Sequence, residues 1–367
     1  MTEHKNRINK LKENLIGNNI DLAIIMDPAN VFYFTGFNSN PHERFLAFIF
    51  EPKNDKYFLF VPALDKDAAS NESIINHIIS ISDEEDAFEV LKPQLSTNHH
   101  LIALEENYMN VHRYKEFQKL YNNAQFTNIE LYINAQRMKK SCSEIIHLQE
   151  AVNIIEKVLC EGIKKVQIGM TELELTGELE LLMKKFGAVG PSFSTIVLSG
   201  EKSALPHGIP GERKFKKGDF LLIDFGVVTK SGYCSDITRT FIIEEATDKQ
   251  KEIYDLVLKS NQAGINSVKA NTELKHFDVN ARKIINDGGY GKYFNNRIGH
   301  GLGLEVHEAP SIHQKNEEIA TPGLFFTIEP GIYIPNFGGV RIEDEVYINE
   351  NGEAEVLTSF PKTLQIL

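Results

Sequence analysis

Cysteine is scarce in this 367-residue chain, where Cys142, Cys160 and Cys234 stand far apart. Three such residues exclude a disulfide framework and a Cys-x-x-Cys metal site. Long apolar runs are also missing: no stretch of 18 apolar residues occurs, and no apolar signal segment follows the polar first residues. The sequence therefore predicts a cytoplasmic protein that does not use a membrane as a partner.

Basic residues are outnumbered, since 39 Lys and Arg stand against 51 Asp and Glu, giving a formal net charge of −12. Nucleic acids and anionic membranes bind clustered Lys and Arg, so this balance disfavours both as partners. An apolar fraction of 42% is enough for a hydrophobic core and argues against a disordered chain. The length suits two domains of ordinary size.

The first 130 residues have the pattern of an alternating α/β domain. Ile8, Leu11 and Leu15 recur at helical spacing and predict an amino-terminal helix. Short apolar runs bounded by turn residues predict four strands, at residues 21–26, 45–50, 57–61 and 101–104. We therefore expect a first domain over residues 1–130.

A second domain is expected over residues 137–361. Capping boxes, in which a Ser or Thr precedes a Glu or Gln by three residues, predict helix starts at Ser141, Thr171 and Thr247. Apolar runs predict strands at residues 194–198, 220–225, 236–243, 324–329 and 340–348. Strands grouped apart from helices are typical of an α+β domain with antiparallel pairing.

Carboxylates interrupt these apolar strands, where a charge is normally unfavourable. Asp224 ends one strand and Asp236 lies on the next, past a turn. A hairpin centred on Lys230 would set the two side chains opposite each other, with Cβ atoms roughly 4.5–5.5 Å apart. Two carboxylates that close repel each other unless a cation lies between them, and two cations about 3.5–4 Å apart can share carboxylate bridges.

The same pattern continues near the carboxy terminus. Glu329 ends another apolar strand, and alternation along residues 340–348 sets Arg341 and Glu343 on one face. His300 is flanked by glycines that let the backbone approach closely, and His307 follows seven residues later. Each of these residues alone is more often structural than functional. Together, four carboxylates and one imidazole favour Mn²⁺, Co²⁺ or Zn²⁺. Asp344 and Glu345 are expected at a solvated edge or behind the ligands.

Five ordered motifs resemble the Xaa-Pro peptidases, a family that includes prolidase and aminopeptidase P. They span residues 222–226, 235–240, 299–303, 327–331 and 339–344. The resemblance covers essentially the whole chain. It implies a creatinase-type α/β domain at residues 1–130, a pita-bread α+β metallopeptidase domain at residues 137–361, and a homodimer.

The resemblance also implies a role for each matching residue. Asp224 would hold one metal ion, His300 and Glu329 a second, and Asp236 and Glu343 would bridge the two. The ions are expected to be Mn²⁺, with Co²⁺ or Zn²⁺ as alternatives. The expected catalytic residues are His207, His307 and Glu329. The expected substrate contacts are Arg341, Tyr333, Arg297, Asn296 and, in the amino-terminal domain, His42 and Arg44.

Two positions depart from the family pattern. The interval from Asp224 to Asp236 is one residue longer than usual, and we expect the turn at residues 229–232 or a bulge to absorb it. Asn296 stands where relatives usually carry a histidine, and an amide cannot carry a proton. The leading hypothesis is an Xaa-Pro dipeptidase acting on short proline-containing peptides. The alternatives are an Xaa-Pro aminopeptidase acting on longer peptides and a homologue that has lost catalysis and binds without metal.

Overall fold

The computed structural model describes residues 3–367, and the chain divides into two compact units after Gln136. The first unit ends at Gln136 and the second spans Arg137–Leu367. Among the helices of the described residues, none is long and apolar enough to cross a membrane.

The amino-terminal unit is built on a six-stranded mixed sheet with the order β4-β3-β2-β1-β5-β6. The predicted strands are confirmed as β1 (Leu22–Ile25), β2 (Ala47–Glu51), β3 (Lys56–Pro62) and β5 (Leu101–Leu104). Strands β4 (Ile78–Ile81) and β6 (Gln125–Asn128) were not predicted. Both lie at the edges of the sheet and bury few residues fully, so neither carries a strong apolar pattern.

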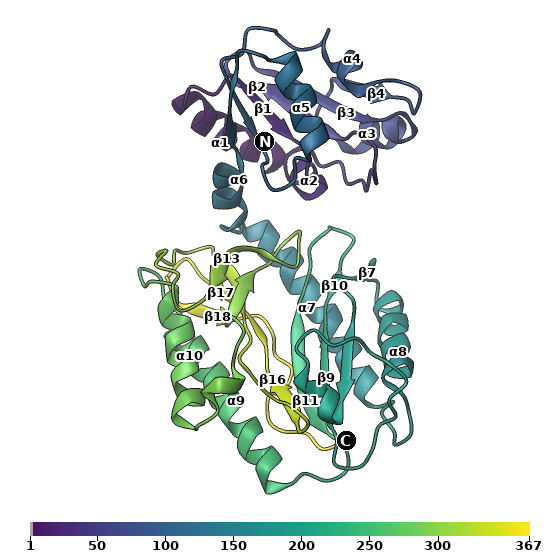
Figure 1. Cartoon of the computed structure of the whole chain (residues 1–367), viewed down its shortest axis with the longest axis vertical. Helices are drawn as coiled ribbons and strands as arrows, with labels where there is room; N and C mark the ends of the chain where they lie inside the picture. The colour runs from purple at the N-terminus through teal and green to yellow at the C-terminus, as the bar shows by residue number, and fades with distance from the viewer. Residues whose placement is uncertain (1–2) are drawn as a thin grey trace. The chain divides into compact units, whose positions relative to one another are not determined.

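Helices accompany this sheet along the chain. The predicted amino-terminal helix is confirmed as α1 (Glu3–Gly17), which buries Ile8, Leu11 and Leu15. The other helical segments are α2 (Pro28–Thr35), η1 (Ala63–Asp65), α3 (Lys66–Glu72), α4 (Ala87–Leu91), α5 (Val111–Leu120) and α6 (Glu130–Arg137). Figure 1 shows α1, α2, α3, α4 and α5 around the sheet of the amino-terminal unit.

The carboxy-terminal unit begins its helices as the sequence predicts. Capping boxes at Ser141, Thr171 and Thr247 open α7 (Cys142–Ile163), α8 (Glu172–Lys185) and α9 (Asp248–Ser267). A further helix, α10 (Lys275–Asp287), lacks a side-chain cap and was not predicted. The short 3₁₀ segments are η2 (Gly200–Ala204) and η3 (Gly291–Tyr293).

Two antiparallel sheets form the centre of this unit. The order β11-β9-β8 makes one sheet, from β8 (Ile196–Ser199), β9 (Phe220–Phe225) and β11 (Ile237–Ile242). The order β13-β12-β14-β17-β18 makes the other, from β12 (Gly299–Gly301), β13 (Glu308–Ile312), β14 (Phe325–Ile328), β17 (Asp344–Ile348) and β18 (Ala354–Val356). Two-stranded ribbons join β7 (Gly190–Pro191) to β10 (Val227–Val228), and β15 (Gly331–Ile334) to β16 (Gly338–Arg341).

Each sheet packs on its own pair of helices. One hydrophobic core joins α7 and α8 to β8, β9 and β11, and a second joins α9 and α10 to β14, β16 and β17. In Figure 1 the strands of this unit accordingly lie between α7 and α8 on one side and α9 and α10 on the other. The two sheets also contact each other, since β11 lies against both β16 and β17.

The single strand predicted at residues 340–348 is wrong. The segment forms β16 and β17, with Ile342 and Glu343 between them. The break occurs because β16 pairs with β15 whereas β17 pairs with β14, so the chain changes partner there. The predicted apolar face survives the break, since Val340, Ile342, Val346 and Ile348 all enter one core.

The predicted register of the Asp224–Asp236 hairpin is also wrong. Asp224 lies opposite Thr238, and Val228 bridges Cys234, so the hairpin is centred on Ser231. The two aspartates are therefore diagonal neighbours, on the same face because the offset is two residues. The sequence did not reveal this register because the turn continues to the Thr229–Tyr233 hydrogen bond.

Candidate active site

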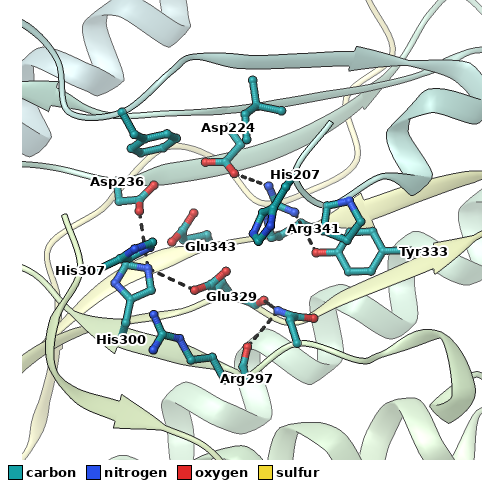
Figure 2. Close-up of a pocket in the computed structure, with 14 residues that line it drawn as sticks. His207, Asp224, Asp236, Arg297, His300, His307, Glu329, Tyr333, Arg341 and Glu343 are labelled. Carbon is teal, nitrogen blue, oxygen red and sulfur yellow. Dashed lines mark hydrogen bonds and ion pairs between the residues drawn. The ribbon is translucent and has the colours of Figure 1, made fainter. Parts of the chain in front are cut away.

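A cavity of about 360 Å³ lies in the carboxy-terminal unit, where strands of the two sheets meet. Figure 2 shows the Asp224 and Asp236 carboxylates on one side, facing Glu329 and His300 across Glu343. The residues that line the cavity are Phe193, Ile196, Pro206, His207, Asp224, Asp236, Asn296, Arg297, His300, His307, Glu329, Tyr333, Arg341 and Glu343. All five predicted metal ligands are among them.

Strand ends position these five side chains. Asp224 lies within β9 and Asp236 directly precedes β11, so one sheet supplies both aspartates. His300 lies on β12 and Glu329 follows β14 in the other sheet. Glu343 occupies the break between β16 and β17, which frees its side chain from a continuous strand.

The arrangement of these atoms suits a divalent cation. Ligand atoms of Asp236, His300 and Glu343 all lie within 4.8 Å of one another. The Nε2 atom of His300 is 3.7 Å from Asp236 Oδ2 and 3.3 Å from Glu329 Oε1. The other oxygen of Asp236, Oδ1, is buried and has no hydrogen-bond partner. A buried carboxylate oxygen without a donor is costly, and a cation would satisfy it.

The tautomer of His300 follows from its hydrogen bond. Its Nδ1 atom is 3.1 Å from the carbonyl oxygen of Gly301, so Nδ1 carries the proton and donates it. The lone pair of Nε2 is then directed at the carboxylates, as a metal ligand requires. Burial and the neighbouring His307 lower the pKa of His300 to about 3, which keeps the imidazole neutral.

The carboxylates carry an electrostatic conflict. Burial, with the neighbouring carboxylates, raises the pKa values of Asp236 and Glu343 well above their usual range. Burial likewise raises the pKa of Glu329 to about 7, against the opposing effect of Arg341. Without cations the site therefore retains protons that divalent ions would replace.

Buried polar partners hold the ligands in place. Arg341 donates to Asp224, to the Tyr333 hydroxyl at 2.8 Å and to Thr238 Oγ1 at 3.0 Å. Thr238 Oγ1 in turn donates to Glu343 Oε2 at 2.7 Å. Hydrogen bonds thus connect Asp224 to Glu343 through Arg341 and Thr238. Tyr333 and Arg341 were predicted as supporting residues, whereas Thr238 was not.

Glu345 and Asp344 lie behind the ligands. Glu345 Oε1 accepts a hydrogen bond of 2.5 Å from the backbone N–H of Asp236. Asp344 pairs with Arg239 and Lys362. Both acids are fully buried, so the solvated edge considered for them is excluded.

The remaining predicted residues occupy different places. The centroid of the His307 ring lies 4.3 Å from that of the His300 ring, and the two rings meet edge-on. His207 lies on an exposed loop and lines the cavity. Arg297 donates to Ser311 Oγ at 3.1 Å, and Asn296 Nδ2 donates to the Arg297 carbonyl at 2.9 Å. Both residues line the cavity.

His42 and Arg44 belong to the amino-terminal unit. There, Arg44 forms a salt bridge with Asp83 at 2.8 Å, and His42 has a left-handed φ of 55° in a loop. Their role as substrate contacts remains a prediction. Phe193, Ile196 and Pro206 line the cavity but were not predicted, because isolated apolar residues carry no signal in a sequence.

Comparison with known proteins identifies the family. Residues 147–350 match Metallopeptidase family M24, and residues 7–139 match the Creatinase/Prolidase N-terminal domain. This chain belongs to metallopeptidase family M24. The predicted resemblance and the predicted pairing of a creatinase-type α/β domain with a pita-bread catalytic domain are both confirmed.

Similar M24 proteins are known by sequence and by structure. YkvY of Bacillus subtilis, named provisionally as a dipeptidase, is 40% identical over 99% of this chain and 100% of its own length. The Xaa-Pro dipeptidase from Bacillus anthracis has 32% identity and a TM-score of 0.91, covering 99% of this chain and 100% of that one. The X-Pro aminopeptidase from Thermotoga maritima has 34% identity and a TM-score of 0.86, covering 97% and 99%. The chain is a metallopeptidase, an exopeptidase of the prolidase type.

Proposed function

We propose that this M24 peptidase is an Xaa-Pro dipeptidase that cleaves the bond before proline. The observation that carries the proposal is a guanidinium, Arg297, on the wall of the same small cavity as the four carboxylates. Relatives of similar fold include an Xaa-Pro dipeptidase, which supports the substrate class.

The proposed cofactor is a pair of divalent ions. Asp224 would hold one ion, His300 and Glu329 the other, and Asp236 and Glu343 would bridge both. When bound, the ions supply Lewis acidity and lower the pKa of a water molecule, which becomes the nucleophile. An oxygen-rich donor set with a single imidazole favours Mn²⁺, with Co²⁺ or Zn²⁺ as alternatives.

The chain's own residues handle the proton and the developing charge. His207 and His307 would donate hydrogen bonds to the carbonyl oxygen as it becomes negative. Glu329 would accept the proton that the attacking water releases and pass it to the leaving nitrogen of proline. Arg341 and Tyr333 would keep Asp224 in place through the bonds that they already form.

An apolar part of the cavity wall favours proline. Phe193, Ile196 and Pro206 line the cavity and offer no charge. A proline ring fixes φ and lacks an N–H, so a pocket shaped to the ring needs no acceptor for that nitrogen. The ring nitrogen of proline would thus meet an apolar surface, while the carbonyl oxygen of the same amide would still accept hydrogen bonds from His207 and His307.

Arg297 would set the preferred substrate length. Its guanidinium donates a hydrogen bond to Ser311 and can form two parallel hydrogen bonds to the free carboxylate of proline. Such a charge-assisted bond contributes about 1.5–3 kcal/mol, equivalent to about tenfold or more in preference for a dipeptide.

The second candidate is an Xaa-Pro aminopeptidase. A neighbouring cavity of about 540 Å³ shares Asn296 and Arg297 with the first, which leaves room for residues beyond proline. A structure of this kind, the X-Pro aminopeptidase from Thermotoga maritima, is among the similar chains. The two candidates differ in whether Arg297 meets a carboxylate or an amide.

Substrate length decides between them. We would measure kcat/KM for Ala-Pro and Ala-Pro-Ala with wild type, Arg297→Ala and Arg297→Lys. The Ala variant should lose about tenfold or more on Ala-Pro and far less on Ala-Pro-Ala, and the Lys variant should lose less because it keeps the charge. Equal losses on both substrates would contradict the carboxylate role, and a wild type that prefers Ala-Pro-Ala would favour the aminopeptidase.

We further propose a cytoplasmic homodimer whose functional domains are residues 1–130 and 137–361. In such a dimer His42 and Arg44 would meet the substrate in the partner's cavity. The mass of the chain is 41.5 kDa, so light scattering would distinguish the dimer from the monomer. A monomer with full activity would contradict this proposal.

A further inference from the structure

The loop that carries His307 is anchored by a buried cluster of charges. Glu308, the next residue, accepts from Arg137 Nη2 at 2.5 Å and from Lys140 Nζ at 2.8 Å. The side chains of the three residues are only 4%, 6% and 2% exposed, respectively. None of them lines the catalytic cavity.

The cluster is completed by the backbone around it. Lys140 Nζ also donates to the Arg137 carbonyl at 2.6 Å, and the N–H of Glu305 donates to Glu308 Oε1 at 3.1 Å. Gly303 leaves the space that the cluster occupies, since a Cβ atom there would lie 2.8 Å from both Glu308 Oε1 and Lys140 Nζ. Residues 303–308 are thus folded around the Glu308 carboxylate.

The charge on Glu308 persists despite burial. Burial alone would raise the pKa of Glu308, but Arg137 and Lys140 lower it to about 2. A paired buried carboxylate tolerates little displacement, because moving it would leave its cations uncompensated. Glu308 thus accepts from two buried cations, of which Arg137 also pairs with Glu305 at 2.8 Å on the same loop.

The same residue is tied to the metal-site strand. Glu308 pairs with Gly301 on β12, at a register shift that directly follows His300. His307 directly precedes Glu308 along the chain, and its ring contacts the His300 ring. Fixing Glu308 from both its backbone and its side chain leaves the His307 backbone little freedom.

We propose that Glu308, Arg137 and Lys140 are positioning residues that hold His307 against His300 in the geometry needed for carbonyl polarisation. The proposal rests on the proposed function, because it assigns His307 the transition-state contact described above. The cluster lies outside the lining of the cavity, so its effect on substrate would pass through His307.

A double-mutant cycle separates this role from general stabilisation. We would measure kcat and KM on Ala-Pro, with Mn²⁺, for wild type, Glu308→Gln, His307→Ala and the double variant. Orienting partners of site residues typically contribute about 10–100-fold, so Glu308→Gln should lower kcat by that factor and change KM by less than about threefold. In the His307→Ala background the same change should lower kcat by less than about threefold. Equal losses in both backgrounds would overturn the proposal.

Two further variants serve as a substitute for Glu308→Gln and as a control for general loss of stability. If Glu308→Gln fails to fold, Lys140→Met replaces it in both backgrounds, because Glu308 keeps its bond to Arg137 there. Asp219→Asn is the matched control, since it weakens a similar pair with Arg213 at 2.6 Å and neither residue lines the cavity. The control should lower stability and leave kcat unchanged.

A crystal structure of the Glu308→Gln variant gives a readout that needs no activity. The His307 ring should leave its 4.3 Å edge-on contact with His300. A ring that stays in place would overturn the proposal. A wild type that cleaves no Xaa-Pro peptide would instead refute the proposed function, while the crystallographic result still decides the role of Glu308.

Discussion

The cost of burying the Glu329 carboxylate among other acids can be measured as a difference in the free energy of unfolding. The Glu329 side chain is 16% exposed, and burial raises its pKa from an ordinary 4.5 to about 7. Glu329→Gln keeps the shape and can still accept the Thr327 hydroxyl bond of 3.3 Å. The variant lacks the titrating carboxyl, so its comparison with wild type reports that group together with its repulsion of Asp236 and Glu343.

The magnitude follows from the shift. A raised pKa means that the folded state keeps a proton that the unfolded state has released. The stability that Glu329 contributes is therefore present below about pH 4.5 and is lost as pH rises through about 7. A pKa shift of about 2.5 units at 1.36 kcal/mol per unit lowers the stability of the folded state by about 3 kcal/mol at pH 8. At pH 5 the same group lowers it by less than about 1 kcal/mol. The metal-free variant should thus be more stable than metal-free wild type at pH 8, by about 3 kcal/mol.

The assay is urea unfolding of EDTA-treated protein at pH 5 and pH 8. Tyrosine fluorescence can report it, because the chain has 12 tyrosines and no tryptophan. Glu318→Gln, which changes an exposed acid in the same unit, should leave stability unchanged at both pH values. A Glu329→Gln variant less stable than wild type at pH 8, or an equal difference at both pH values, would refute the reasoning.

Three other results are expected. Glu343→Ala should abolish peptide cleavage by removing a proposed bridge, with an unchanged circular dichroism spectrum; retained activity would refute the assignment. The acid limb of the kcat/KM profile should move to lower pH as Mn²⁺ is raised, because protons and metal compete for the carboxylates; a limb indifferent to metal would point to another group. Mn²⁺ should raise the unfolding midpoint of wild type but not of Glu343→Ala, since only a site that binds the ion couples it to stability; equal shifts would argue against this site.

The site was more predictable than its surroundings because charge within an apolar strand is a strong local signal. Asp224 and Glu329 each interrupt such a strand, and both line the cavity. The helix starts were equally accessible, since a capping box at Ser141 or Thr171 is complete within four residues. These features depend on neighbours along the chain.

Features that depend on distant partners were missed. The break at Glu343 occurs because β16 pairs with β15 whereas β17 pairs with β14. The sequence of residues 340–348 alone does not show that the two halves have different partner strands. The Glu308 cluster joins residues 168 and 171 positions apart, so its cations were not recognised as buried. The apolar lining at Phe193 likewise becomes visible only once the cavity exists.

The central claim is that five side chains in one cavity hold two divalent ions. Anomalous diffraction from crystals grown with Mn²⁺ tests it most directly. The account predicts two peaks per chain, both within the cavity and both contacted by Asp236 and Glu343. A crystal of active enzyme with no peak in this cavity, or with peaks bound by other residues, would contradict the account.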